Sequence, residues 1–248
     1  MELKLSTWIE VKSYLDKYKS IILPIGSTEQ HGPMGLIGTD SICPETIAKG
    51  IAEKIEVLIA PTIQIGMSQH HLEFPGSLTL RPTTFIAVIK DTIQSLIHHG
   101  FSHIFFLNGH GGNINSIQSA FAEVYTENSL SGQESEFRLK LCNWYMSENM
   151  TKISDTYFKG AEGHHATPSE VSLSFFAHPE AAKKTDLSPK IAPSGELHDA
   201  INYQKQFPDG RIGSDSSLAT IEIGKKIFLA AVSDITEDFL KFDHSRKK

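Results

Sequence analysis

Three side chains of the types that bind metal ions lie close together in residues 26–40, which read GSTEQHGPMGLIGTD. They are Glu29, His31 and Asp40, and they follow the apolar run 21–25. The glycines and the proline of this segment predict a loop. A carboxylate and an imidazole one residue apart at the end of a buried strand can turn toward one point, and a second carboxylate can complete a metal site. A solvated turn with incidental charges is the alternative, because a short Glu-x-His pattern often arises by chance.

A second candidate segment is the turn 108–113, which reads NGHGGN. It follows residues 102–107, which read SHIFFL and are expected to form a buried strand, and it precedes a predicted helix, so His110 is expected at the carboxyl end of a strand. Open α/β sheets bind their ligands at this edge. The glycines could instead surround a phosphate, but the segment lacks the lysine of a P-loop and the spacing of a dinucleotide-binding motif. Asn108 and Asn113 are expected to stabilise the turn rather than to contact a substrate.

The third candidate segment is 160–172, GAEGHHATPSEVS, which contains His164, His165 and Glu170. Thr167 can cap a helix that has proline at its first position, and Glu170 then stands where the acid of a capping box belongs. Helix capping and metal binding are therefore competing interpretations of Glu170, and in strict form each excludes the other.

The composition limits the class of protein. A chain of 248 residues with 40% hydrophobic residues is expected to form one α/β domain over 1–248. The net charge of −6 argues against a nucleic-acid partner, and the only basic cluster is the terminal 246–248. No apolar run reaches the length of a membrane span or signal peptide, so no membrane partner is expected. Cys43 and Cys142 form no CxxC pair, which fits a cytoplasmic location.

Apolar periodicity predicts alternating strands and helices, the pattern of an α/β protein with a mostly parallel sheet. Strands are expected over 20–25, 57–65, 102–107 and 137–145, and helices over 6–18, 41–55, 83–98, 114–125, from Thr167 onward, and over 218–242. The polar segment 67–82 is expected to cross the sheet edge and reach the site. Segment 185–217 is expected to be a long loop, with a short helical turn over 196–203, that covers the site or a neighbouring subunit. Trp144 ends the strand 137–145, where it could belong to the core or form a platform for a substrate.

Taken together, these motifs resemble the creatininase family, the creatinine amidohydrolases and their relatives, in the branch that carries NGHGGN. The motifs GSTEQHG…GTD, GMSQHHLEFPG, NGHGGN, GHHATPSEVS and GSDSSLATIEIGKK occur in family order over residues 21–228. The resemblance implies a three-layer α/β/α sandwich, a homo-oligomer that is often a hexamer, and hydrolysis of C–N bonds with two divalent metal ions.

Carried over by position, the resemblance makes Glu29, Asp40 and His110 ligands of one metal ion. Asp40 would bridge to a second ion that His31 also binds. Creatinine-specific members have a glutamate ligand at the position of Gly112 here, and Glu170 is the expected substitute. Carboxylates and imidazoles suit zinc or manganese, and iron is also compatible.

The resemblance also suggests roles in substrate chemistry. His165 is the candidate for proton transfer to the leaving nitrogen, although a histidine in this place can instead only orient a ligand. Trp144, His71 and His164 are candidates for substrate binding, whereas His70 is expected to face solvent. Creatininases carry a tryptophan where this chain has Ala161 or Glu162, so creatinine is not the expected substrate.

These inferences lead to a metal-dependent amidohydrolase that acts on a small, nitrogen-rich cyclic amide or formamide through a metal-bridging hydroxide. Within the family, a deformylase of a pyrimidine intermediate or a small-peptide hydrolase is the alternative. A phosphorylated substrate would need an arginine near the site, and only Arg81 and Arg211 lie in suitable loops. Outside the enzymes, the alternative is a non-catalytic metal-binding subunit that serves assembly.

Overall fold

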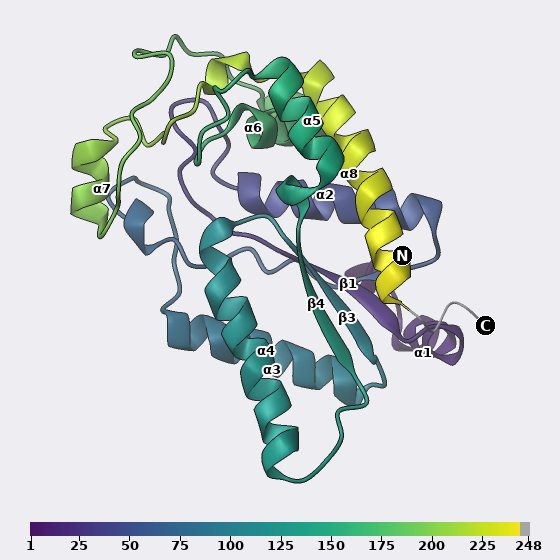
Figure 1. Ribbon diagram of the computed structural model, residues 1–248. Helices are drawn as coiled ribbons and strands as arrows, with labels where there is room; N and C mark the ends of the chain where they lie inside the picture. The colour runs from purple at the N-terminus through teal and green to yellow at the C-terminus, as the bar shows by residue number, and fades with distance from the viewer. Residues whose placement is uncertain (244–248) are drawn as a thin grey trace.

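Four parallel strands form the centre of the computed structural model, which describes residues 1–243 (Figure 1). The sheet order is β2-β1-β3-β4, with bounds β1 Ser20–Ile25, β2 Leu58–Ile59, β3 His103–Asn108 and β4 Arg138–Asn143. β1 and β3 pair along their full lengths, from Ser20 opposite His103 to Ile25 opposite Asn108. The carboxyl ends of β1, β3 and β4 therefore lie at one edge of the sheet, where ligands bind in folds of this kind. The basic cluster 246–248 lies outside the described residues.

Helices cover both faces of the sheet (Figure 1). On one side are α1 Trp8–Lys17, α3 Pro82–His98 and α4 Ile114–Leu130. On the other are α2 Thr39–Lys54, α5 Glu148–Tyr157, α6 Pro168–Ala177 and α8 Ile221–Phe242. The short helix α7, Ala200–Gln206, stands apart from these layers, on the loop side of the molecule (Figure 1). The arrangement confirms the predicted α/β class.

The residues of β1 explain why both faces must be covered. All six are buried, and successive side chains point to opposite faces. Ile21 and Leu23 pack in the cluster that contains Phe85 of α3, whereas Ile22 packs in the cluster that contains Ile47 of α2. A strand that is apolar on both faces is typical of parallel sheets between two helix layers.

Several predicted boundaries differ from the structure. The strand predicted over 57–65 is reduced to β2, because Pro61 follows it and has no N–H to donate to a sheet. Helix α1 is capped by Thr7, and α8 starts later than predicted, with Thr220 as its cap. Helix α5 was not predicted at all.

Two irregular segments reach the same end of the sheet. Segment 67–82 contains the single 3-10 turn Gln69–His71, and it is tied to the loop after β1 by the bond from Leu78 N to Thr28 O, at 2.8 Å. Segment 185–217 is held by the fully buried Arg211, which donates to the carbonyl oxygens of Pro189, Lys190 and Ser214. Among residues 1–243, no helix has the length and apolar character that crossing a membrane requires.

Candidate active site

The loop after β1 carries Glu29 into the interior, where its side chain is fully buried. Its Oε2 accepts a hydrogen bond from Ser68, which in turn contacts Ser27. Its Oε1 makes no hydrogen bond within residues 1–243, yet it lies 3.3 Å from Nδ1 of His110 and 3.3 Å from Nε2 of His71. One oxygen is thus fixed by a hydroxyl and the other is directed at imidazole nitrogens.

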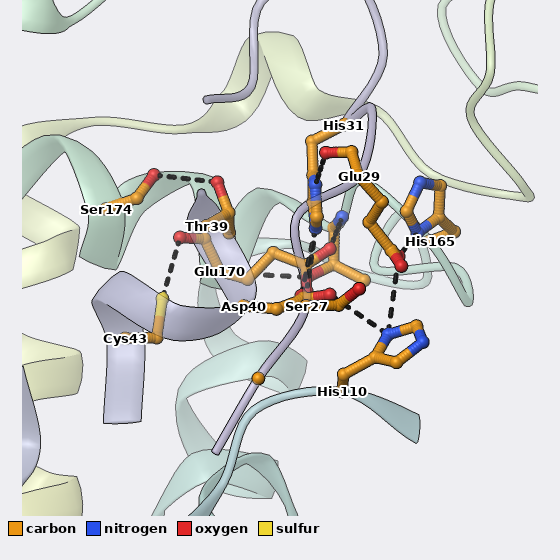
Figure 2. Close-up of polar contacts among 12 residues, drawn as sticks. Ser27, Glu29, His31, Thr39, Asp40, Cys43, His110, His165, Glu170 and Ser174 are labelled. Atoms are coloured by element: carbon orange, nitrogen blue, oxygen red, sulfur yellow. Dashed lines mark hydrogen bonds and ion pairs between the residues drawn. The ribbon is translucent and has the colours of Figure 1, made fainter. Parts of the chain in front are cut away.

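Asp40, in the first turn of α2, directs its two oxygens at different histidines (Figure 2). Oδ1 lies 3.1 Å from Nε2 of His31, and Oδ2 lies 3.0 Å from Nδ1 of His110. Oδ2 is buried and has no hydrogen-bond partner in the described part of the chain. A carboxylate placed in this way can belong to two neighbouring groups of ligands at once.

When the ring of His110 is neutral, its proton lies on the side away from these carboxylates. Its Nε2 lies 2.9 Å from the carbonyl oxygen of Met67, which can only accept a hydrogen bond, so Nε2 donates. In the neutral ring, Nδ1 then presents a lone pair toward Glu29 and Asp40. Three ligand atoms with lone pairs that converge in a buried place fit a metal ion. The hydrogen bond from His110 Nε2 to Met67 is of the kind that metal-binding histidines usually make with their other ring nitrogen.

The turn that carries His110 is fixed by its two asparagines, as expected from the sequence. Asn108 accepts from His110 N at 3.2 Å and donates to His110 O at 2.7 Å. Asn113 donates to the carbonyl oxygen of Gly26 at 2.9 Å and so joins the turn to the loop after β1.

His31 is arranged in the same manner as His110. Its Nδ1 lies 3.1 Å from the backbone oxygen of Glu29, which leaves Nε2 facing Oδ1 of Asp40 and, at 3.9 Å, Oε2 of Glu170. Two groups of possible ligands therefore share Asp40. They are Glu29, Asp40 and His110, and His31, Asp40 and Glu170, and within each group the ligand atoms lie within 4.8 Å of one another.

Glu170 corrects the prediction that helix capping and ligand binding exclude each other. Its Oε1 accepts from the backbone N of Thr167 at 2.6 Å, while Thr167 Oγ1 accepts from Glu170 N at 3.2 Å, which completes a capping box at the start of α6. Its other oxygen, Oε2, faces His31. The two carboxylate oxygens have separate roles, so the cap fixes the side chain in the orientation that a ligand would need.

The charges of this cluster shift its pKa values strongly. Burial alone would lower the pKa of both histidines, but Asp40 raises that of His31 to about 10 and Glu29 with Asp40 raises that of His110 to about 9. For Glu29, burial acts against ionisation, but His110 and His71 lower its pKa to about 2. Burial raises the pKa of Glu170 to about 7. The negative charge of the carboxylates keeps protons bound to the histidines, and a divalent cation would replace these protons.

His165 and His71 complete the wall around Glu29. Nδ1 of His165 lies 3.7 Å from Glu29 Oε1, and its ring stacks on that of His71 with centroids 4.4 Å apart. Burial holds the pKa of His165 well below its usual value, which favours the neutral ring. Together with Glu29 and His31, His165 also forms a third group of possible metal ligands.

A cavity of about 410 Å³ opens over these residues. His71, His164 and His165 line it, as do Glu29, Asp40, His110 and Glu170. Trp144 lines it too, although it is only 1% exposed and packs in the core, as the core interpretation predicted. Its role as a platform for a substrate stays a prediction. Its Nε1 is buried without a hydrogen-bond partner within 1–243.

Other residues of the site differ from expectation or were not predicted. His70 was expected to face solvent, but it is half-buried and lines the cavity. Arg211 is fully buried and bonded to Asp209, and neither it nor Arg81 is among the lining residues. Segment 185–217 contributes Leu197 and Ile212 to the cavity of its own chain.

The fold and the site together define an α/β protein with two adjacent groups of metal-binding side chains that share one carboxylate. A family model described as Creatininase, creatinine amidohydrolase, matches residues 4–239. The chain therefore belongs to the creatininase family, as the motifs predicted.

Curated relatives cover most of the chain but differ in what their names say they act on. A creatinine amidohydrolase of Pseudomonas putida is 26% identical over 93% of both chains. A mycofactocin precursor peptide peptidase of Mycobacterium ulcerans is 26% identical over 88% of this chain and 83% of its own. A 3-dehydro-scyllo-inosose hydrolase of Thermotoga maritima is 29% identical over 89% of this chain and 76% of its own.

Solved structures confirm the fold. A manganese form of creatininase matches with a TM-score of 0.84 and 22% identity, over 98% of both chains. A zinc–zinc form of a creatininase mutant matches with a TM-score of 0.83 and 21% identity, over 98% of both chains.

Proposed function

We propose that the chain is a dinuclear metal-dependent amidohydrolase that cleaves a C–N bond of a small cyclic amide or formamide. The observation that carries the proposal is the position of Asp40, whose two oxygens lie 3.1 and 3.0 Å from the nitrogens of two different histidines. A buried carboxylate oxygen without a hydrogen-bond partner within residues 1–243, such as Oδ2 of Asp40, is costly unless a cation neutralises it.

Two ions fit the residues present. Glu29, Asp40 and His110 would hold one, and His31, Asp40 and Glu170 would hold the other. Zinc or manganese suits these oxygen and nitrogen ligands, and the zinc and manganese forms of related structures support this choice. When bound, such ions supply Lewis acidity toward an amide carbonyl and lower the pKa of a water molecule to near neutrality.

His165 is the residue proposed to move protons. Its neutral ring directs Nδ1 toward Glu29 Oε1 and the cavity, so it can accept a proton and pass it to the leaving nitrogen. His71, His164 and Trp144 would contact the substrate, because all three line the cavity.

The charge of the cavity restricts the substrate. Four acidic side chains line it, Glu29, Asp40, Glu162 and Glu170, and no lysine or arginine does so within residues 1–243. A phosphorylated substrate would find no arginine to bind it, because Arg211 is fully buried. A neutral, nitrogen-rich amide fits this lining.

One alternative within the family has a specific observation in its favour. The relative that acts as a peptidase of a precursor peptide aligns with 88% of this chain, and a cavity of about 410 Å³ has room for more than a single small ring. A small peptide is therefore the second candidate substrate. A non-catalytic assembly subunit is disfavoured, since all five proposed ligands and His165 are retained together.

The test is a hydrolysis screen of cyclic amides, formamides and small peptides with zinc-loaded and manganese-loaded protein. Asp40→Asn should lower turnover by at least about 100-fold, because the variant loses the charge shared by both ligand groups. Asp91→Asn, the same change at an exposed position of α3, should leave turnover unchanged. Asp40→Asn with the activity of the unmodified chain would refute the proposal.

A further inference from the structure

Gln30 lies between two histidines of the site and contacts both. Its side chain is only 7% exposed, and its Oε1 accepts from Gly32 N at 2.8 Å. Because the backbone N–H can only donate, this bond fixes which end of the amide is oxygen. The NH2 end therefore faces His71 Nδ1 and His165 Nε2, each at 2.9 Å.

The proton of His165 follows from the backbone of the same residue. Its Nε2 lies 2.8 Å from the carbonyl oxygen of Gln30, which can only accept, so Nε2 carries the proton. In the neutral ring, Nδ1 is then free of a proton, and this atom lies 3.7 Å from Glu29 Oε1, in a ring that lines the cavity.

The proton of His71 follows from counting the donors of the Gln30 amide. One N–H of its NH2 group points to the carbonyl oxygen of Gly210, at 2.9 Å. His165 Nε2 already carries a proton and cannot accept the other. The second N–H has two acceptors in reach, the Tyr203 hydroxyl oxygen at 3.4 Å and His71 Nδ1 at 2.9 Å, and the shorter contact assigns it to His71. The proton of the neutral His71 ring is then on Nε2, 3.3 Å from Glu29 Oε1.

The surroundings leave the amide little freedom to turn. Gly210 has a φ of +83°, and a Cβ at this position would overlap the side-chain amide of Gln30. The hydroxyl of the fully buried Tyr203 donates to the Gly210 carbonyl at 2.7 Å and so holds it in place. Segment 185–217 thus presents a fixed acceptor to Gln30.

We infer that Gln30 is a positioning residue that sets the tautomers of both histidines, with its backbone oxygen for His165 and its side-chain amide for His71. His165 is thereby left with an unprotonated Nδ1 toward the cavity, and His71 with an N–H toward Glu29. The catalytic consequence rests on the proposed function, but the proton positions do not.

Gln30→Glu separates the two contributions, because it replaces the NH2 donor by an acceptor and keeps the backbone oxygen. We expect ¹⁵N solid-state NMR of histidine-labelled, zinc-loaded protein to show both histidines protonated at Nε2 and unprotonated at Nδ1. In Gln30→Glu, a proton should appear on Nδ1 of His71, while His165 keeps its proton on Nε2. His71→Gln and His165→Gln would assign the signals.

Gln64→Glu makes the same chemical change at an exposed position and should leave the spectrum as it is. On a substrate found in the screen, Gln30→Glu should lower kcat about 10- to 100-fold, more than it changes KM, as is usual for residues that orient a metal-site histidine.

A proton on Nδ1 of His71 or of His165 in the unmodified protein, or an unchanged His71 in Gln30→Glu, would overturn the inference. The spectrum of the unmodified protein tests the inference even if the variant does not fold. If the protein gives the predicted spectrum but hydrolyses no amide in the screen, only the proposed function is refuted.

Discussion

At the residue scale, the site is a cluster of carboxylates and imidazoles that compete for protons and for cations. His31 and His110 have pKa values raised to about 10 and about 9 by the carboxylates beside them. Without metal ions these histidines therefore stay protonated at neutral pH, and a metal ion can bind only as the protons leave.

This competition predicts the pH dependence of metal binding. Because the metal-free chain binds these protons up to about pH 9, its affinity for zinc should rise with pH between 6.5 and 8.5. At pH 7, calorimetry in buffers of different ionisation enthalpy should report release of about two to three protons per chain, one each from His31 and His110 and a fraction of one from Glu170, whose pKa is about 7. His31→Gln should reduce this number by about one, whereas His98→Gln, at an exposed position, should not. Zinc binding that releases no protons would contradict the assignment.

At the scale of secondary-structure elements, two helices of the chain begin with the same capping box. Thr167 and Glu170 form it at α6, where Glu170 also faces His31. Thr7 and Glu10 form it at α1, where both side chains are exposed and neither belongs to the site. The chain thus contains its own control for the structural effect of the cap.

Thr167→Ala and Thr7→Ala should each lower the free energy of unfolding by about 1 kcal/mol, measured with urea. Only Thr167→Ala should also weaken binding of the second metal ion, by about 10-fold, because it loosens the first turn of α6 that carries Glu170. Equal metal affinity in the two variants would show that the cap does not position this carboxylate.

The same elements show how far the sequence alone could lead. Glu29, Asp40 and His110 could be predicted as neighbours because a loop and a turn at the carboxyl ends of β1 and β3 must meet at one sheet edge. The two directions of the Glu170 carboxylate could not, because the sequence does not show that one oxygen faces the helix backbone and the other faces His31. Gln30 was missed for a related reason, because its partners Gly210 and His165 are 180 and 135 residues away in the sequence.

The predicted boundaries of helices and strands were wrong where the local sequence pattern was weak. Helix α5 was missed because it follows the strand β4 almost at once and has only Met150 fully buried. The strand after α2 was predicted too long because its apolar residues continue beyond Pro61, while the backbone there meets β1 only at isolated positions such as Ile63.

At the scale of the whole molecule, we propose a homo-oligomer, as the family resemblance implies. Light scattering of the purified protein should give a multiple of the chain mass of 27.4 kDa, and the resemblance implies that this multiple is often six. A mass of 27.4 kDa that does not change with concentration would refute this expectation.

The proposed dinuclear site holds two metal ions per chain, and Glu170 is a ligand of only the second ion. Elemental analysis of the reconstituted protein tests it most directly, with Glu170→Gln compared with Glu10→Gln, the same change in the exposed capping box of α1. The amide oxygen of glutamine can still cap the helix, so both variants should fold. We expect about two ions per chain in the unmodified protein and in Glu10→Gln, and about one in Glu170→Gln. An unmodified protein that stays metal-free after reconstitution would refute the dinuclear site, and a Glu170→Gln variant that keeps both ions would refute Glu170 as a ligand.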